Sequence, residues 1–211
     1  MSTEMQRTNE WYEQRLGRFT ASEVHALMGV KGLGDTGISL ARKKAQEIVF
    51  GRDESWDVET CDMKRGREQE EIAFEIFKAK KGLEFVNVEK AIFFPISSYS
   101  GASPDGLVGS DAVLEIKCPR PESFFKMIEL GEEAVDKKWI FQMQLQMKAT
   151  NSVMAHLFLY LEWKGEQLTH EIVFEYNEKI VEEMMSRIRL AVKHRDEIVK
   201  VLRQNLRKVT D

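Results

Sequence analysis

The stretch that decides the fold contains Ser103-Pro104-Asp105-Gly106 and, shortly after it, Val113-Leu114-Glu115-Ile116-Lys117. In an extended strand, successive side chains point to opposite faces, so Glu115 and Lys117 share one face while Leu114 and Ile116 lie on the other. The Gly-Ser-Asp turn at 109–111 allows this strand to fold back against the segment that carries Asp105. We therefore expect the carboxylates of Asp105 and Glu115 to converge.

Two converging carboxylates form a hard-oxygen site suited to Mg²⁺ or Mn²⁺, with water, a backbone carbonyl and a substrate phosphate in the remaining positions. Lys117 at its edge is suited to polarise or help deprotonate an attacking water and to balance charge in the transition state. Taken alone, a Glu-x-Lys strand usually carries solvated charges, and a Pro-Asp-Gly turn is commonplace. The prediction of a metal-dependent hydrolytic site depends on finding them together.

Hydrophobic periodicity organises the rest of the chain. It predicts helices at 9–16, 39–50, 63–80, 137–150 and from 178 onward, and strands within 85–94, 100–118, 153–163 and 167–176. Thr20 and Glu23 fit a capping box, which predicts a further helix beginning at Thr20. The order predicts an α/β fold, a mixed sheet flanked by helices, in a single domain over residues 1–211.

A Gly-x-Gly-x-x-Gly spacing occurs at Gly32, Gly34 and Gly37. A dinucleotide site requires a strand before these glycines, whereas the predicted helix from Thr20 precedes them. We interpret the segment as a loop that ends that helix.

Composition sets limits on the class of protein. With 43% hydrophobic and 31% charged residues among 211, the chain is typical of soluble globular proteins. The net charge of −4 is not that of a strongly basic nucleic-acid binder, although an enzyme with metal-binding carboxylates can be acidic overall. Two cysteines are too few for a disulfide framework or an iron-sulfur cluster. Without an apolar run long enough to span a membrane or a secretory signal, we expect a cytoplasmic protein.

These residues resemble a known family. Pro104-Asp105 followed by Glu115-Ile116-Lys117 matches the PD-(D/E)xK nuclease signature, and the longer strings 101–106 and 114–119 resemble the phage lambda exonuclease and YqaJ-like viral recombinase branch. Further motifs of that branch are similar to segments found here in the same order: Trp11 with Arg15 and 20–22, Arg65-Gly66 with Glu70, and Gln142-Met143-Gln144. The resemblance extends to about Gln146 and implies a restriction-endonuclease-like PD-(D/E)XK core.

The resemblance implies a role for each residue of the catalytic centre. Asp105, Glu115 and the carbonyl of Ile116 would bind Mg²⁺, with Mn²⁺ as a substitute, and Lys117 would be the catalytic lysine. Glu70 would face the same centre, and Gln142 would place the water or the scissile phosphate. Trp139 lies three residues before Gln142, so one helix face can present both to the site and the DNA.

Arg15, Ser22 and Ser103 correspond to positions that line a pocket for a terminal 5′-phosphate in this family. Arg15 can offer a two-pronged guanidinium to phosphate, and Ser22 would lie in the first turn of the helix from Thr20, which favours anions. The family often has a further basic phosphate ligand after Lys-Cys-Pro, for which Arg120 and Lys126 are imperfectly placed candidates.

The family implies a 5′-to-3′ exonuclease that acts on linear double-stranded DNA with a 5′-phosphate. It would release 5′-mononucleotides and leave 3′ overhangs for a single-strand annealing protein in phage-type recombination, in the bacterial cytosol. The family also suggests a homotrimeric ring. Two alternatives stay open: an endonuclease of restriction or repair type that uses the same triad, and a catalytically inactive DNA-binding module.

Overall fold

A computed structural model of the protein describes residues 8–52, 60–82, 84, 87–90 and 92–206. Its central element is a five-stranded mixed sheet in the order β2 (Val88–Lys90), β5 (Gly106–Val108), β6 (Ala112–Lys117), β7 (Met154–Trp163) and β8 (Glu166–Glu175). Neighbouring strands in it are antiparallel except for β6 and β7, which are parallel. The predicted mixed sheet is confirmed.

Tight turns join two of the antiparallel pairs of this sheet, β5 to β6 and β7 to β8. Gly109, with a φ of 60°, lies in the turn that joins β5 to β6, and this turn pairs Gly106 with Leu114. Lys164 and Gly165 join β7 to β8, and both have positive φ, as in a two-residue turn whose twist matches the flanking strands.

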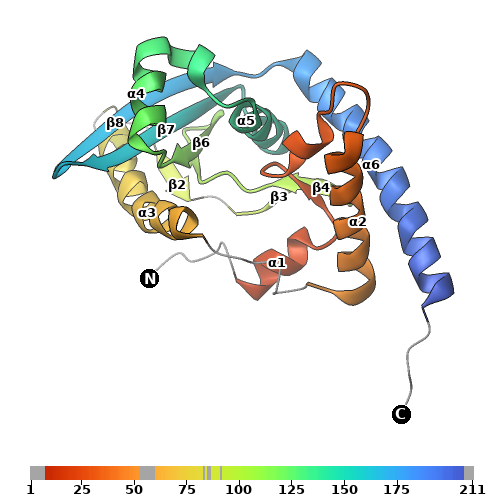
Figure 1. Ribbon diagram of the computed structural model, residues 1–211. Helices are drawn as coiled ribbons and strands as arrows, with labels where there is room; N and C mark the ends of the chain where they lie inside the picture. The colour runs from red at the N-terminus through yellow and green to blue at the C-terminus, as the bar shows by residue number, and fades with distance from the viewer. Residues whose placement is uncertain (1–7, 53–59, 83, 85–86, 91, 207–211) are drawn as a thin grey trace.

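The parallel pair requires a crossover, and the crossover supplies helices to one face of the sheet. Between β6 and β7 the chain forms α4 (Pro121–Leu130), the 3₁₀ helix η3 (Gly131–Ala134) and α5 (Lys137–Thr150). On the opposite face lies α3 (Cys61–Gly82), so the sheet is sandwiched between helices (Figure 1). Val113 of β6 packs in the cluster with α4 and α5, whereas Leu114 and Ile116 pack in the cluster with α3. The predicted alternation of β6 is therefore confirmed.

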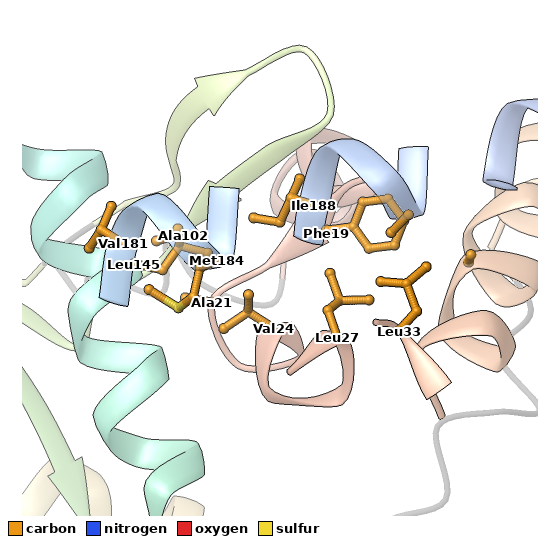
Figure 2. Packing of buried hydrophobic residues seen from close by; sticks show 12 residues of the cluster. Phe19, Ala21, Val24, Leu27, Leu33, Ala102, Leu145, Val181, Met184 and Ile188 are labelled. Carbon is orange, nitrogen blue, oxygen red and sulfur yellow. The ribbon is translucent and has the colours of Figure 1, made fainter. Parts of the chain in front are cut away.

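A second, smaller sheet combines β1 (Phe19–Thr20), from the N-terminal part of the chain, with β4 (Ser100–Ala102) and β3 (Phe94–Ser97), in the order β1-β4-β3. It follows α1 (Asn9–Arg15) and lies beside α2 (Gly34–Phe50) and α6 (Glu178–Asn205), two helices that contact each other. Figure 2 shows its buried cluster, in which Phe19 and residues of the 3₁₀ helix η1 (Val24–Leu27) lie near Met184 and Ile188 of α6.

Gly101 in β4 is required by close packing. A β-carbon at this position would lie 2.7 Å from the carbonyl oxygen of Phe94 and closer still to the ring of Phe93. Because β4 leads directly to Ser103 and Asp105, this glycine allows the small sheet to pack tightly next to residues of the candidate site.

The predicted helix beginning at Thr20 is wrong. Thr20 belongs to β1, where pairing with Gly101 keeps the backbone extended, and the helical turn that follows is η1, with Glu23 at its N-cap. The Thr20 hydroxyl donates to the Glu23 carboxylate at 2.7 Å, and that carboxylate forms an ion pair with Lys44 at 3.1 Å. Glu23 therefore pairs with Lys44, a residue distant in the sequence, instead of completing a local capping box.

The observed bounds of the other predicted helices differ less from the expected ones. The helix expected at 39–50 begins at Gly34, and Gly37 is buried within it, so the glycine segment is partly helical and not a simple loop. The helix α4 was not predicted, because Pro119 and Pro121 resemble a turn, although proline is well suited to the first position of a helix. Among the described residues, no helix has the length and apolar character needed to cross a membrane.

Candidate active site

The hairpin of β5 and β6 places Asp105 beside Ile116. The N–H of Asp105 donates to the carbonyl of Leu114 at 3.0 Å, and the N–H of Ile116 donates to Asp105 Oδ2 at 2.7 Å. In a strand, the N–H and C=O of one residue point to the same side. The carbonyl of Ile116 therefore lies on the same side of β6 as the Asp105 carboxylate.

Glu115 forms the centre of the site. Its side chain is 1% exposed, and its Oε1 accepts hydrogen bonds from Lys117 Nζ and, at 2.7 Å, from Gln142 Nε2. Its Oε2 accepts from Gln146 Nε2 at 2.5 Å. The expected sharing of one face by Glu115 and Lys117 is confirmed, and α5 supplies two amides to the same carboxylate.

The centre carries an excess of negative charge. Burial raises the pKa of Asp105 well above its ordinary value, and the charges of Glu115 and Glu70 raise it further. Burial alone would lower the pKa of Lys117, but Glu115 and Asp105 outweigh it, so the pKa of this lysine is raised. Glu70 on α3 is thus within electrostatic reach of both Asp105 and Lys117.

The donor atoms suit a hard divalent cation. Across the described residues, no three side chains of His, Cys, Asp or Glu gather closely enough to hold a metal by themselves. However, Mg²⁺ usually takes one or two protein carboxylates and keeps several waters. Asp105, Glu115 and the Ile116 carbonyl fit this pattern, because a divalent ion would offset both the burial and the carboxylate repulsion that raise the Asp105 pKa.

A second polar cluster lies at the end of α1. Arg15 Nη1 donates to Ser103 Oγ at 3.3 Å, and Arg15 Nη2 donates to Thr20 Oγ1 at 3.3 Å and to Ser22 Oγ at 3.5 Å. Trp11 Nε1 also donates to Ser103 Oγ, at 3.1 Å, and its ring lies 4.0 Å from the guanidinium carbon. The structure thus brings together Arg15, Ser22 and Ser103, as expected, although Ser22 lies in a turn before η1 and not in a helix.

Buried charges hold this cluster in place. The backbone of Gly17, directly after α1, is bound on both sides: its N–H donates to Glu47 Oε2 and its carbonyl accepts from Arg195 Nη1, each at 2.8 Å. Lys44, 4% exposed, pairs with Glu47 and Glu23, both at 3.1 Å. None of these residues stood out in the sequence, because charged residues at helical spacing normally lie on a solvated face.

The remaining expected residues take less central places. The ring centroid of Trp139 lies 5.9 Å from Lys117 Nζ, so Trp139 is beside the centre. Arg120 directly precedes α4, and Lys126 lies on the exposed side of that helix. Arg65 donates to the carbonyl of Cys118, at the end of β6, at 3.4 Å.

Gln146 was missed by sequence reasoning. The resemblance drew attention to Gln142 and Gln144, but Gln144 turns away: its amide binds the carbonyl of Glu175 and the N–H of Asn177, each at 2.7 Å. Gln146 lies one helical turn after Gln142 and reaches the centre. The i, i+4 spacing was the available signal, because such residues share a helix face.

The fold is of the PD-(D/E)XK nuclease-like class. The structure is similar to an alkaline exonuclease, LHK-Exo, from Laribacter hongkongensis, with a TM-score of 0.78 and 24% identity, covering 93% of this chain and 97% of that chain. The structure of LHK-Exo in complex with dAMP gives the same TM-score and coverage at 26% identity. A phage-related exonuclease from Haemophilus somnus 129PT follows, with a TM-score of 0.68 and 17% identity over 88% of this chain and 96% of that one.

The sequence also matches a known family. The model of the YqaJ-like viral recombinase domain matches residues 10–152, and the chain belongs to that family. A comparison with curated proteins gave no significant match. The matched region includes α1, β5, β6 and α5, the elements that carry the candidate site.

Proposed function

We propose that this protein is a Mg²⁺-dependent exonuclease that degrades one strand of linear double-stranded DNA from a phosphorylated 5′ end. The observation that carries the proposal is the position of Ser103 between the two polar clusters. Its hydroxyl accepts from Trp11 and Arg15, and its carbonyl accepts from Gln146, which also binds Glu115. These contacts support a metal centre next to an anion pocket, an arrangement that would accommodate two successive phosphates of one strand.

Asp105, Glu115 and the carbonyl of Ile116 would bind the metal ion, with Mn²⁺ as a substitute for Mg²⁺. When bound, the ion makes hydroxide available near neutral pH and stabilises the departing oxygen. Lys117, in its protonated form, would donate to the phosphate oxygens as negative charge develops on them. Gln142 would orient the attacking water or the scissile phosphate, and Glu70 would act from α3 on the same centre.

The anion pocket would make the enzyme specific for DNA ends. Arg15, Ser22 and Ser103 would bind the terminal 5′-phosphate, and burial lowers the pKa of Arg15 but leaves a guanidinium that stays charged at neutral pH. Trp139, beside Lys117, would contact the DNA strand. With the terminal phosphate bound, the next phosphate lies at the metal centre, so each cleavage would release one 5′-mononucleotide.

The remaining 3′ overhang is the substrate that a single-strand annealing protein requires, so we propose a role in phage-type recombination in the bacterial cytosol. We also propose a homotrimeric ring around the DNA. Such a ring would explain how a chain of net charge −4 stays on a polyanion, because topology can retain a substrate that weak electrostatics would release.

The proposal is tested with two DNAs in one tube: a linear duplex with 5′-phosphates and a covalently closed circle, each with Mg²⁺ or with EDTA. We expect Mg²⁺-dependent loss of the linear DNA alone, with release of 5′-mononucleotides and survival of the 3′ strands. Cutting of the circle would instead indicate an endonuclease. Binding without loss of either DNA would indicate an inactive DNA-binding module.

A further inference from the structure

Gln146 is a fully buried amide with an orientation that its neighbours settle. Its Nε2 lies 2.5 Å from Glu115 Oε2 and 3.4 Å from the carbonyl oxygen of Ser103, and its side chain is 0% exposed. Both neighbours are acceptors, so rotating the amide by 180° would bring oxygen against oxygen. The N–H groups must therefore face Glu115 and Ser103.

In this orientation the oxygen of the Gln146 amide lacks a hydrogen-bond donor among the described residues. Gln146 Oε1 is buried and accepts no hydrogen bond from the described part of the protein. A buried acceptor without a donor costs about 1–3 kcal/mol. The Gln146 amide therefore lacks a hydrogen bond at Oε1 but donates two from Nε2, to the Glu115 carboxylate and the Ser103 carbonyl. We infer that these two contacts determine the position of the side chain.

The two acceptors belong to different parts of the proposed site. Glu115 is a metal-binding candidate on β6, whereas Ser103 presents its hydroxyl to Arg15 and Trp11 in the anion pocket. Gln142 and Lys117 already bind Oε1 of Glu115, so Gln146 fixes the other oxygen, Oε2. Its amide is thereby a direct link between the two polar clusters.

We propose that Gln146 is a positioning residue that couples the 5′-phosphate pocket to the metal centre by holding the Ser103 backbone and the Glu115 carboxylate at a fixed separation. This inference rests on the proposed function and adds a residue to it. Gln146 touches neither DNA nor metal, and it acts through Ser103 and Glu115. Hydrogen-bond partners of metal ligands commonly change metal affinity by about 10- to 100-fold when they are removed.

The test compares Gln146→Met with Gln144→Met. Both glutamines lie on α5 and are almost fully buried, at 0% and 2% exposure, and both lose an amide that binds a main-chain carbonyl. Gln144 connects β8 to the start of α6, so its replacement controls for the loss of a buried amide in itself. Three quantities are measured on each protein: Mn²⁺ affinity by calorimetry without DNA, the ratio of kcat/KM for 5′-phosphoryl over 5′-hydroxyl duplex ends, and the thermal unfolding midpoint.

We expect Gln146→Met to weaken Mn²⁺ binding by about tenfold and to lower the phosphoryl-to-hydroxyl ratio towards one. Gln144→Met should lower the unfolding midpoint but leave the other two quantities at their wild-type values. If Gln146→Met does not fold, Gln146→Asn replaces it, because an amide shorter by one methylene cannot reach both acceptors.

Wild-type values of both Mn²⁺ affinity and end preference in a folded Gln146 variant would overturn the inference. A change in Mn²⁺ affinity alone would overturn the coupling, because Gln146 would then orient Glu115 without affecting the pocket. Failure of the proposed function is recognised separately, in the wild-type protein, as an absence of metal-dependent cleavage or of any preference for a 5′-phosphate.

Discussion

Two carboxyl groups in this molecule have pKa values shifted in opposite directions, although burial acts on both in the same direction. Burial raises the pKa of Asp105, and the charges of Glu115 and Glu70 raise it further. Burial would also raise the pKa of Glu23, but the Lys44 ammonium and the Thr20 hydroxyl outweigh it, so this pKa is lowered. In the corner around Gly17, formed by Glu23, Lys44, Glu47 and Arg195, the charges are paired. The centre around Glu115 instead has an excess of carboxylates, because Asp105, Glu115 and Glu70 share the ammonium of Lys117. Paired buried charges position the backbone, and unbalanced ones indicate a site for a ligand of opposite charge.

The largest effect should come from removing a carboxylate of the unbalanced centre. We expect Asp105→Asn to lower Mg²⁺-dependent cleavage by about a thousandfold, which corresponds to the several kcal/mol of transition-state stabilisation that a bound metal supplies. In EDTA, the same variant should be more stable than the wild type near neutral pH. A folded pKa above the unfolded value means that ionisation opposes folding as pH rises beyond about 4. Cleavage assays and urea unfolding measure the two effects, and a less stable variant would contradict this account of the centre.

Removing a charge from the corner around Gly17 should have the opposite effect on stability, because the charges there are paired. Lys44→Ala leaves the buried Glu47 and the partly buried Glu23 without their shared cation, and we expect it to destabilise the fold by about 3–5 kcal/mol. Arg42→Ala, on the exposed side of the same helix, should stay within about 0.5 kcal/mol of the wild type. Urea unfolding at neutral pH measures both, and equal effects of the two substitutions would show that the corner does not depend on its pairing.

A smaller effect is expected from Arg15, which lies two residues before Gly17 and binds Ser103. Arg15→Lys keeps the charge but cannot reproduce the fork that binds Ser103, Thr20 and Ser22 together. We expect kcat/KM on 5′-phosphorylated ends to fall by about tenfold, the equivalent of one charge-assisted hydrogen bond. The rate on 5′-hydroxyl ends should barely change and serves as the internal control. An equal loss on both ends would indicate general DNA binding by Arg15.

The smallest effect concerns a third cluster, of paired charges, formed by His156, Glu171 and Lys81. The hydrogen bond from His156 at 2.6 Å and the nearby Lys81 lower the pKa of Glu171 to about 2. Its stabilisation should be complete above the unfolded pKa of 4.5 and be lost as pH falls from there towards 2. After solvent screening, we expect it to be worth about 1 kcal/mol. Urea unfolding at pH 6 and pH 3 should show a smaller difference in Glu171→Gln than in the wild type.

Some regions of this fold could be predicted from the sequence and others could not, for a physical reason. The helix at 137–150 was predicted at its observed bounds, and its N-cap Asp136 and its left-handed C-cap Asn151 are local signals. The helix expected at Thr20 failed, because pairing of Thr20 with Gly101 and the ion pair of Glu23 with Lys44 are long-range contacts that outweigh a local capping box. Lys44, Glu47 and Arg195 carry no local sign of burial, so the corner could not be foreseen.

The sequence by itself determined the meeting of Asp105, Glu115 and Lys117, because a short turn and the alternation of a strand are local geometry. The resemblance, not periodicity, suggested that Arg15, Ser22 and Ser103 lie together. Helical spacing places Gln146, and not Gln144, on the face of Gln142, but only the packing of α5 decided that this face meets Glu115 while Gln144 meets the start of α6. Hydrogen bonds between elements distant in the sequence, and not propensity, select which polar side chains enter the site.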